Sequence, residues 1–288
     1  MASPLWQRVR FGAYADDAPW PGVEPHLALE RALGVRLPIM SWFLSMDSAW
    51  PAEQAAAAAA SGHDLLICLE PQLSTGQAVP LASILSGAWD EHLDGLSEAA
   101  SAYPGQVVIR FAHEPNLDRL PWSLDHPEPC VRDVQEWIAT WRYVASRHPA
   151  ANVRWMWCVD SGDSGAILAE SYWPGADVVD LLGIDAYNGF GPWMPPAELI
   201  GPMYERVTAL HPAAGLWLAE TGCRPADPGE PHDKAAWFED LLTSTQFPRL
   251  STVSFFHADK EQDWRITDPA VRETLATYLA SPAWRLER

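Results

Sequence analysis

The chain has 288 residues, 48% of them hydrophobic, and its 38 acidic and 19 basic residues give a net charge of −19. This charge argues against a nucleic-acid partner, because binding to a phosphate backbone needs a basic face, and it suits a soluble protein with a neutral substrate. No apolar run reaches the length of a membrane span, so we expect no membrane partner.

The cysteines are too far apart for the common metal or redox motifs. The four residues, Cys68, Cys130, Cys158 and Cys223, form no CxxC pair, which excludes a zinc ribbon and a thioredoxin-like site. Three of them lie in or just after predicted strands, so we expect buried free thiols instead of disulfides.

The first residues do not resemble a secretion signal. Residues 1–7 lack a basic segment followed by an apolar one. We expect a secreted or periplasmic protein whose signal lies outside this sequence, and a cytoplasmic location stays open. We also expect a monomer.

Apolar runs of strand length alternate with helix-forming segments along the whole chain. The predicted strands are 8–14, 37–43, 64–70, 106–111, 153–159, a segment within 177–187, 215–220 and 250–256. The predicted helices are 25–33, 55–60, 87–103, 131–147, 197–210, 233–243 and 269–279, with a short helical turn within 160–175. Segments 87–103 and 131–147 repeat apolar side chains every three or four positions, the spacing of one buried helical face.

This alternation predicts an α/β fold, a single (β/α)8 TIM barrel that forms one domain over residues 1–288. No linker or change of composition divides the chain. An open doubly wound sheet is the alternative, but the sequence contains neither GxGxxG nor GxxxxGK[ST], the phosphate-binding loops that often open such a sheet.

Two predicted strands lead into a glutamate. Strand 106–111 contains Arg110 and runs into His113, Glu114 and Asn116, and strand 215–220 ends at Glu220. The carboxyl ends of parallel strands meet at one rim of a barrel, where active sites form. A structural ion pair is one interpretation, since a buried carboxylate needs a partner. Two glutamates on one rim instead indicate glycoside hydrolysis, in which one carboxyl protonates the leaving oxygen and the other attacks the anomeric carbon or activates water.

Aromatic side chains are candidates for holding sugar rings. The 16 tryptophans are many for this length, and we expect contacts with sugar from Trp157, Trp193 and Trp264. Trp155 and Trp157 alternate on one strand and so share a face, which either lines the rim or packs against helices. Further candidates for binding the substrate lie at or just after strand ends: Glu70, Arg110, His113, Asn116, Tyr187 and His257.

The order of the motifs resembles glycoside hydrolase family 26. They are Arg-Phe-Ala-His-Glu-Pro-Asn at 110–116, Gly-Ile-Asp-Ala-Tyr at 183–187, Ala-Glu-Thr-Gly at 219–222, and the segment 257–265 that contains Trp264. That family holds mostly β-mannanases, with some mixed-linkage β-glucanases and β-1,3-xylanases, in a clan of retaining barrel enzymes. The resemblance implies that Glu114 is the general acid/base and Glu220 the nucleophile. It also implies that His113 is the histidine preceding the acid and Tyr187 the tyrosine that hydrogen-bonds the nucleophile.

We therefore expect a retaining endo-β-glycosidase that needs no metal or other cofactor. Its partner would be a β-linked polysaccharide or oligosaccharide: mannan, mixed-linkage glucan, β-1,3-xylan or a bacterial exopolysaccharide. Where the family often has a tryptophan on strand eight, this chain has Phe255 and Phe256, so the sugar stays open.

Two other classes of protein remain as alternatives. One is a metal-dependent barrel hydrolase, since His113, Glu114, Asp185, Glu220 and His257 are all ligand types, although no HExxH motif occurs. The other is a barrel that binds a glycan without cleaving it. Asp185 itself is expected either to bind the sugar or to pair with an arginine or histidine.

Overall fold

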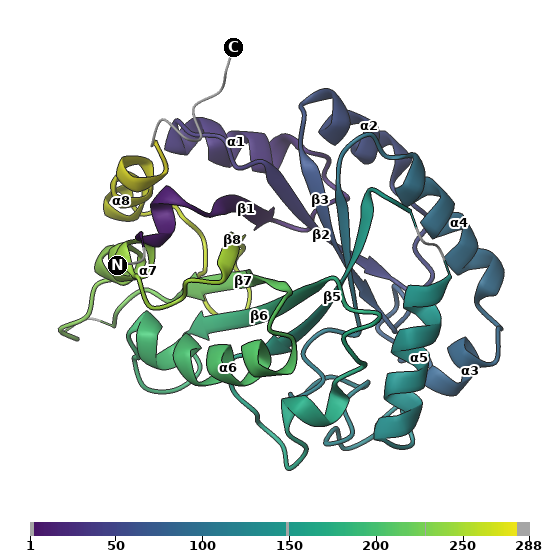
Figure 1. Ribbon diagram of the computed structural model, residues 1–288. Coiled ribbons are helices and arrows are strands. Elements are labelled where there is room, and N and C mark those ends of the chain that lie inside the picture. Colours follow the sequence, from purple (N-terminus) through teal and green to yellow (C-terminus); the bar gives the residue numbers. More distant parts are fainter. Residues whose placement is uncertain (1–2, 148–149, 228, 281–288) are drawn as a thin grey trace.

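The fold is a closed parallel barrel surrounded by helices. The structure is a computed structural model that describes residues 3–147, 150–227 and 229–280. Strands β1 to β8 pair in chain order, and β8 pairs with β1 to close the sheet. The helices surround the strands on the outside (Figure 1). The predicted TIM barrel is confirmed.

The elements follow the predicted order. The strands are β1 (Arg10–Ala15), β2 (Ile39–Ser45), β3 (Asp64–Glu70), β4 (Val107–Phe111), β5 (Val153–Asp160), β6 (Leu181–Asn188), β7 (Gly215–Cys223) and β8 (Leu250–His257). The helices are α1 (Glu24–Leu33), α2 (Ala52–Ala60), α3 (Leu81–Leu85), α4 (Asp90–Ala102), α5 (Val134–Ser146), α6 (Pro196–Leu210), α7 (Lys234–Thr243) and α8 (Pro269–Leu279), with 3-10 turns η1 (Leu5–Gln7) and η2 (Ala169–Tyr172).

Two differences from the predicted elements have physical causes. Helix α3 was not predicted, because five residues are too few to show a helical repeat. Strand β7 continues past Glu220, where we expected it to end, and its pairing with β8 shifts register between Leu218 and Thr221. The irregular register therefore lies at the glutamate itself, as β-bulges often do beside active sites.

Aspartates fix the starts of three helices. The side chain of Asp133 accepts from the amide of Glu136 at α5, and that of Asp233 accepts from two amides at α7. The side chain of Asp268 accepts from the amide of Ala270 at α8. These carboxylates satisfy amides that have no partner within the helix and favour the positive end of its dipole.

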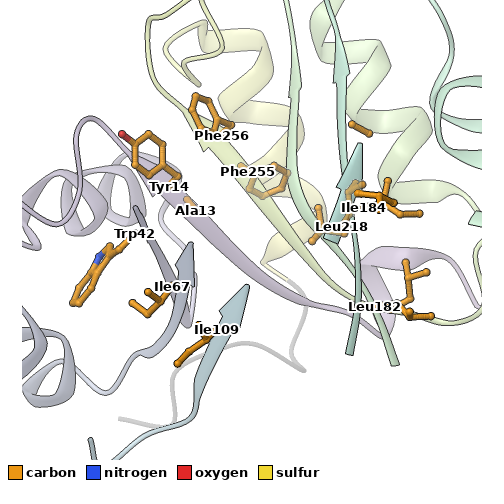
Figure 2. Close-up of a cluster of buried hydrophobic side chains, with 14 of the residues drawn as sticks. Ala13, Tyr14, Trp42, Ile67, Ile109, Leu182, Ile184, Leu218, Phe255 and Phe256 are labelled. Atoms are coloured by element: carbon orange, nitrogen blue, oxygen red, sulfur yellow. The ribbon is translucent and has the colours of Figure 1, made fainter. Parts of the chain in front are cut away.

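Alternation along the strands divides the apolar residues into two layers. Outward-facing residues such as Ile67, Ile109 and Ile184 belong to the large cluster that includes the helices, and Figure 2 shows part of it. A second cluster contains only strand residues, among them Leu66 and Val108, and fills the barrel interior. The inner layer is the apolar base above which the polar strand ends converge.

The expected state of the cysteines is confirmed, since all four are free thiols and three of them are buried. Among the described residues, no helix is both long and apolar enough to cross a membrane.

Close contact between β1 and β2 yields a test of the packing. A Cβ at Gly12 would lie 2.8 Å from the carbonyl oxygen of Ile39 and 2.9 Å from its Cβ. Because that carbonyl belongs to the neighbouring strand, Gly12→Ala should lower the free energy of unfolding by about 1–3 kcal/mol. A Cβ at exposed Gly95 in α4 meets nothing within 4 Å. Gly95→Ala should therefore raise that free energy by about 0.5–1 kcal/mol. Urea denaturation measures both, and a Gly12→Ala protein as stable as wild type would contradict this packing.

Candidate active site

The carboxyl ends of the strands surround one open pocket of about 490 Å³. Glu114, just beyond β4, and Glu220, in β7, both line it, although three strand pairings separate β4 from β7. Of the other predicted site residues, Glu70, His113, Tyr187 and Trp264 line the pocket. Two carboxyls distant in sequence therefore share one cavity.

Arg110 is the buried centre of the site. Its Nη1 donates to Asp185 Oδ2 at 2.6 Å, its Nη2 donates to Glu220 Oε1, and neither the Arg110 nor the Asp185 side chain is exposed. The hydroxyl of Tyr187 donates to the other oxygen of Glu220. Both oxygens of Glu220 thus accept from fixed donors, which orient the carboxylate and stabilise its charged form.

We expected both Arg110 and Asp185 to contact sugar. Both side chains are instead fully buried, which corrects that expectation. Arg110 binds Glu220, and Asp185 binds Arg110 and raises the pKa of Glu114. Burial raises the pKa of the Asp185 carboxyl, and the Arg110 guanidinium opposes that rise. The structural alternative for Asp185, a partner for arginine, is the one that the structure shows.

Glu114 lies in a different environment. Only 2% of its side chain is exposed, and its Oε2 accepts from Arg119 Nη2 at 2.9 Å. Burial raises the pKa of Glu114 well above its usual range, the carboxylates of Asp185 and Asp160 add to this, and Arg119 and Arg110 oppose it. A carboxyl that keeps its proton near neutral pH has the property that a general acid needs.

The backbone that presents Glu114 is strained. Ala112 and Glu114 both have a φ of 49°, a left-handed conformation that non-glycine residues rarely adopt. The amide of Glu114 donates to the carbonyl of Cys158 at 3.0 Å, and Trp122 Nε1 donates to the carbonyl of His113 at 2.7 Å. These bonds hold the turn, and such strain is concentrated at functional sites in proteins.

His113 is a neutral neighbour of Glu114. Burial, aided by Arg110, Arg119 and Lys260, holds its pKa well below the usual range. Its Nε2 lies 3.9 Å from Glu114 Oε2, and its Nδ1 lies 3.1 Å from the thiol sulfur of Cys68. The imidazole therefore adds no positive charge that would pull the proton from Glu114.

Asn116 is a structural residue, and the expected sugar contact is wrong. Its Nδ2 donates to the carbonyl oxygens of Asp160 and Gly162 and to Asp163 Oδ1, at 3.1 to 3.2 Å, and its Oδ1 accepts from the Asp160 amide at 3.0 Å. The side chain is fully buried and ties the end of β5 to the Glu114 turn. Burial raises the pKa of Asp160 to about 7, and its carboxyl is one of those that act on Glu114.

Three other predicted contacts with sugar lie outside the pocket wall. Trp157 faces the helices, is fully buried and packs edge-on against Trp173 at 5.0 Å. Trp193 stacks on His232 with ring centroids 4.8 Å apart. His257 accepts the amide of Ile266 at its Nδ1, at 2.8 Å. Full burial corrects the prediction for Trp157. Trp193 and His257 are half-buried, and their contacts with sugar stay predictions.

The pocket wall combines aromatic rings with charged groups. Trp264 packs against Tyr187 and Phe190, with ring centroids 4.9 and 5.5 Å away. Glu70 accepts from Gln72 Nε2 at 2.9 Å, and burial raises the pKa of its carboxyl. Phe190 is exposed, whereas Trp264 is 1% exposed. An exposed aromatic ring beside carboxyl oxygens suits a sugar ring with its hydroxyls.

Several wall residues were not predicted from the sequence. They are Phe43, Arg119, Leu120, Phe190, Phe256, Lys260 and Glu261. Two of them had a sequence signal: Arg119 follows Glu114 by five residues in the same loop, and Phe256 lies on the strand where the family often has a tryptophan. The others come from loops and strand ends whose direction only the fold determines.

The metal-site alternative fits these residues poorly. Ligand atoms of His113, Glu114 and Asp185 lie within 4.8 Å of one another, a spacing that a metal ion can use. However, Asp185 already pairs with Arg110, and Glu114 already pairs with Arg119. A divalent cation there would lie beside two guanidinium groups, so its electrostatic stabilisation would be small.

The buried Arg110 pair makes a testable prediction. Arg110→Met should lower the free energy of unfolding by about 3–5 kcal/mol, because two buried carboxylates lose their partner. In that variant both folded-state pKa values rise above the unfolded ones, so stability falls as pH rises. The defect should be larger at about pH 8 than at about pH 5. Arg142→Met, which breaks an exposed pair with Asp177, should cost less than about 1 kcal/mol. Chemical denaturation measures the free energy of unfolding of both variants. Equal losses of this free energy would contradict the role given to Arg110.

Known proteins resemble the chain in sequence and in fold. The family model of glycosyl hydrolase family 26 matches residues 83–238, more than half of the chain. Endoglucanase H of Acetivibrio thermocellus is 26% identical over 283 residues, which cover 90% of this chain and 29% of that protein. The chain thus spans less than a third of the length of this curated relative.

Solved structures share the barrel. A modular endo-β-1,4-mannanase from Cellulomonas fimi superposes with a TM-score of 0.67 at 16% identity, over 96% of this chain and 71% of that one. A β-mannanase from Bacteroides ovatus gives a TM-score of 0.66 at 18% identity, over 99% and 96% of the two chains. The family match carries the assignment, and this chain belongs to glycosyl hydrolase family 26.

Proposed function

We propose that the protein is a retaining endo-β-glycosidase that hydrolyses a β-linked polysaccharide by double displacement. The observation that supports this most is the pair of carboxyls, Glu114 and Glu220, lining one pocket in opposite environments. Glu220 accepts from two fixed donors, whereas burial and neighbouring carboxylates favour a proton on Glu114. Pairs of carboxyls in contrasting environments mark the acid and nucleophile of glycosidases.

In the first step, the Glu220 carboxylate attacks the anomeric carbon. The glycosidic carbon–oxygen bond breaks, and Glu114 gives its proton to the leaving oxygen. An ester joins the sugar to Glu220. In the second step, the Glu114 carboxylate takes a proton from water, and the water oxygen attacks the anomeric carbon. The ester breaks, which restores the Glu220 carboxylate and leaves Glu114 protonated.

This mechanism gives the surrounding residues their roles. Arg110 and Tyr187 hold the Glu220 carboxylate in a single orientation before the substrate arrives. Arg119 contacts Glu114, and neutral His113 lies beside it. For retention, the two carboxyl groups must lie about 5–5.5 Å apart, which leaves no room for a water between one carboxyl and the sugar.

The sugar itself is to be found by experiment. The relatives are named an endoglucanase and mannanases, and β-mannan, mixed-linkage β-glucan, β-1,3-xylan and bacterial exopolysaccharide are the substrates to compare. Reducing-end release and product sizes over this panel identify the sugar and separate endo from exo action. A protein that binds one of these glycans yet cleaves none would be the non-catalytic barrel instead.

The two glutamates should fail in different ways. Glu114→Ala should slow hydrolysis of the natural glycan by about 100-fold or more, since acid catalysis is worth about 10²–10⁴-fold. It should slow the first step on a dinitrophenyl glycoside far less, because that leaving group needs no proton. Glu220→Ala is the matched control and should lose activity on both substrates. Pre-steady-state rates measure these effects, and equal losses for both substrates in Glu114→Ala would contradict its acid role.

A further inference from the structure

Arg119 holds an exposed position over a buried carboxyl. Its Nη2 lies 2.9 Å from Glu114 Oε2, and 53% of its side chain is exposed, against 2% for Glu114. It also lines the pocket. The guanidinium is therefore the solvent-facing member of the pair, and an ion pair with such a member is easily exchanged for another partner.

The Arg119 guanidinium has N–H groups that form no hydrogen bond to the described residues. Across residues 3–147, 150–227 and 229–280, its Nε and Nη1 form no hydrogen bond, and Nη2 bonds only to Glu114. Arginine offers five N–H donors in a planar fork. At the wall of a sugar pocket, such donors suit the oxygen atoms of sugar hydroxyls.

The mechanism also places Arg119 relative to the substrate. A general acid stands beside the glycosidic oxygen that it protonates. Arg119 contacts this acid directly and, among the described residues, makes no hydrogen bond or ion pair with Glu220. A place beside the leaving-group sugar fits these contacts.

The charges around Glu114 come from several elements. Asp185 of β6 and Asp160 of β5 favour a proton on Glu114, whereas Arg110 of β4 and Arg119 oppose it. His113 is neutral and lies 3.9 Å away. Tyr187 of β6 is also near, and burial keeps its phenol protonated by raising its pKa. Among the described residues, Arg119 is the one cation with a hydrogen bond to Glu114.

We infer that Arg119 is a positioning residue that couples occupancy of the leaving-group side to the protonation of Glu114. This rests on the proposed function. With that side empty, the guanidinium donates to Glu114 Oε2, as the structure shows, and lowers the pKa of that carboxyl. When a sugar binds on that side, its oxygen atoms accept hydrogen bonds from the guanidinium in place of Glu114. Glu114 then keeps its proton for the first step. When the leaving sugar departs, Arg119 returns and stabilises the carboxylate that acts as base in the second step.

The first test needs no turnover. Glutamate carboxyl carbons are labelled with ¹³C, and the Glu114 signal is assigned by its loss in Glu114→Gln. Arg119→Met should raise the apparent pKa of Glu114 by about one pH unit, and Arg119→Lys should restore most of the difference. Lys260→Met is the matched control, because Lys260 lines the same pocket over aromatic rings and does not contact Glu114. No change in Arg119→Met, or an equal change in Lys260→Met, overturns the pairing.

The second test measures the pKa of Glu114 with an oligosaccharide bound in the pocket. The oligosaccharide that wild type cleaves best is added to Glu220→Ala, which binds it without turnover. The pKa of Glu114 should rise on binding in Glu220→Ala and stay constant in Glu220→Ala/Arg119→Met. An equal rise in both proteins overturns the coupling. If wild type cleaves none of the glycans, the proposed function fails, while the titration of the ligand-free protein still decides the pairing.

Kinetics distinguishes positioning from a merely structural role. With a dinitrophenyl glycoside, the second step limits turnover and needs Glu114 as a base. Arg119→Met should slow this step near neutral pH and recover at higher pH, where Glu114 is ionised again. A rate lowered equally at every pH, with Glu114 titrating as in wild type, would mean that Arg119 only maintains the loop.

Discussion

The buried guanidinium of Arg110 is the interaction on which the site depends. It joins Asp185 and Glu220, carboxylates from β6 and β7, in the interior of a closed barrel. Without a cation there, the two acids could be buried only by taking up protons, and a protonated Glu220 is no nucleophile. The apolar inner layer below supports this ionic layer, so the stability of the barrel and the charge of Glu220 both depend on Arg110.

The two carboxyls have contrasting electrostatic environments because they occupy different positions on the rim. Glu220 accepts two hydrogen bonds from groups fixed in the barrel. Glu114 sits on a strained turn, faces other carboxylates and meets one exposed arginine. The environment of Glu220 stabilises a negative charge, and the environment of Glu114 allows its carboxyl to release and regain a proton. This difference is the chemical asymmetry that double displacement needs.

The fold and the two glutamates could be predicted from the sequence because both follow from strand periodicity. Eight apolar runs predicted the barrel, and the ends of parallel strands must meet at one rim. Side-chain partners could not be predicted in this way. The side-chain amide of Asn116 hydrogen-bonds the backbone of Asp160 at the end of β5. Trp157 shares the outward face of its strand with Trp155. Residue type indicated what these side chains can bind, but their direction and partners depend on loops and on neighbouring strands.

The central claim is that Glu114 and Glu220 act as a pair across one pocket, with a sugar ester as the intermediate. Proton NMR of the sugar released in the first turnovers, recorded before mutarotation, tests it most directly. The account predicts that the β-configuration of the substrate is retained. An α-configured first product would show a single displacement by water, and the assignment of Glu220 as nucleophile would then be wrong.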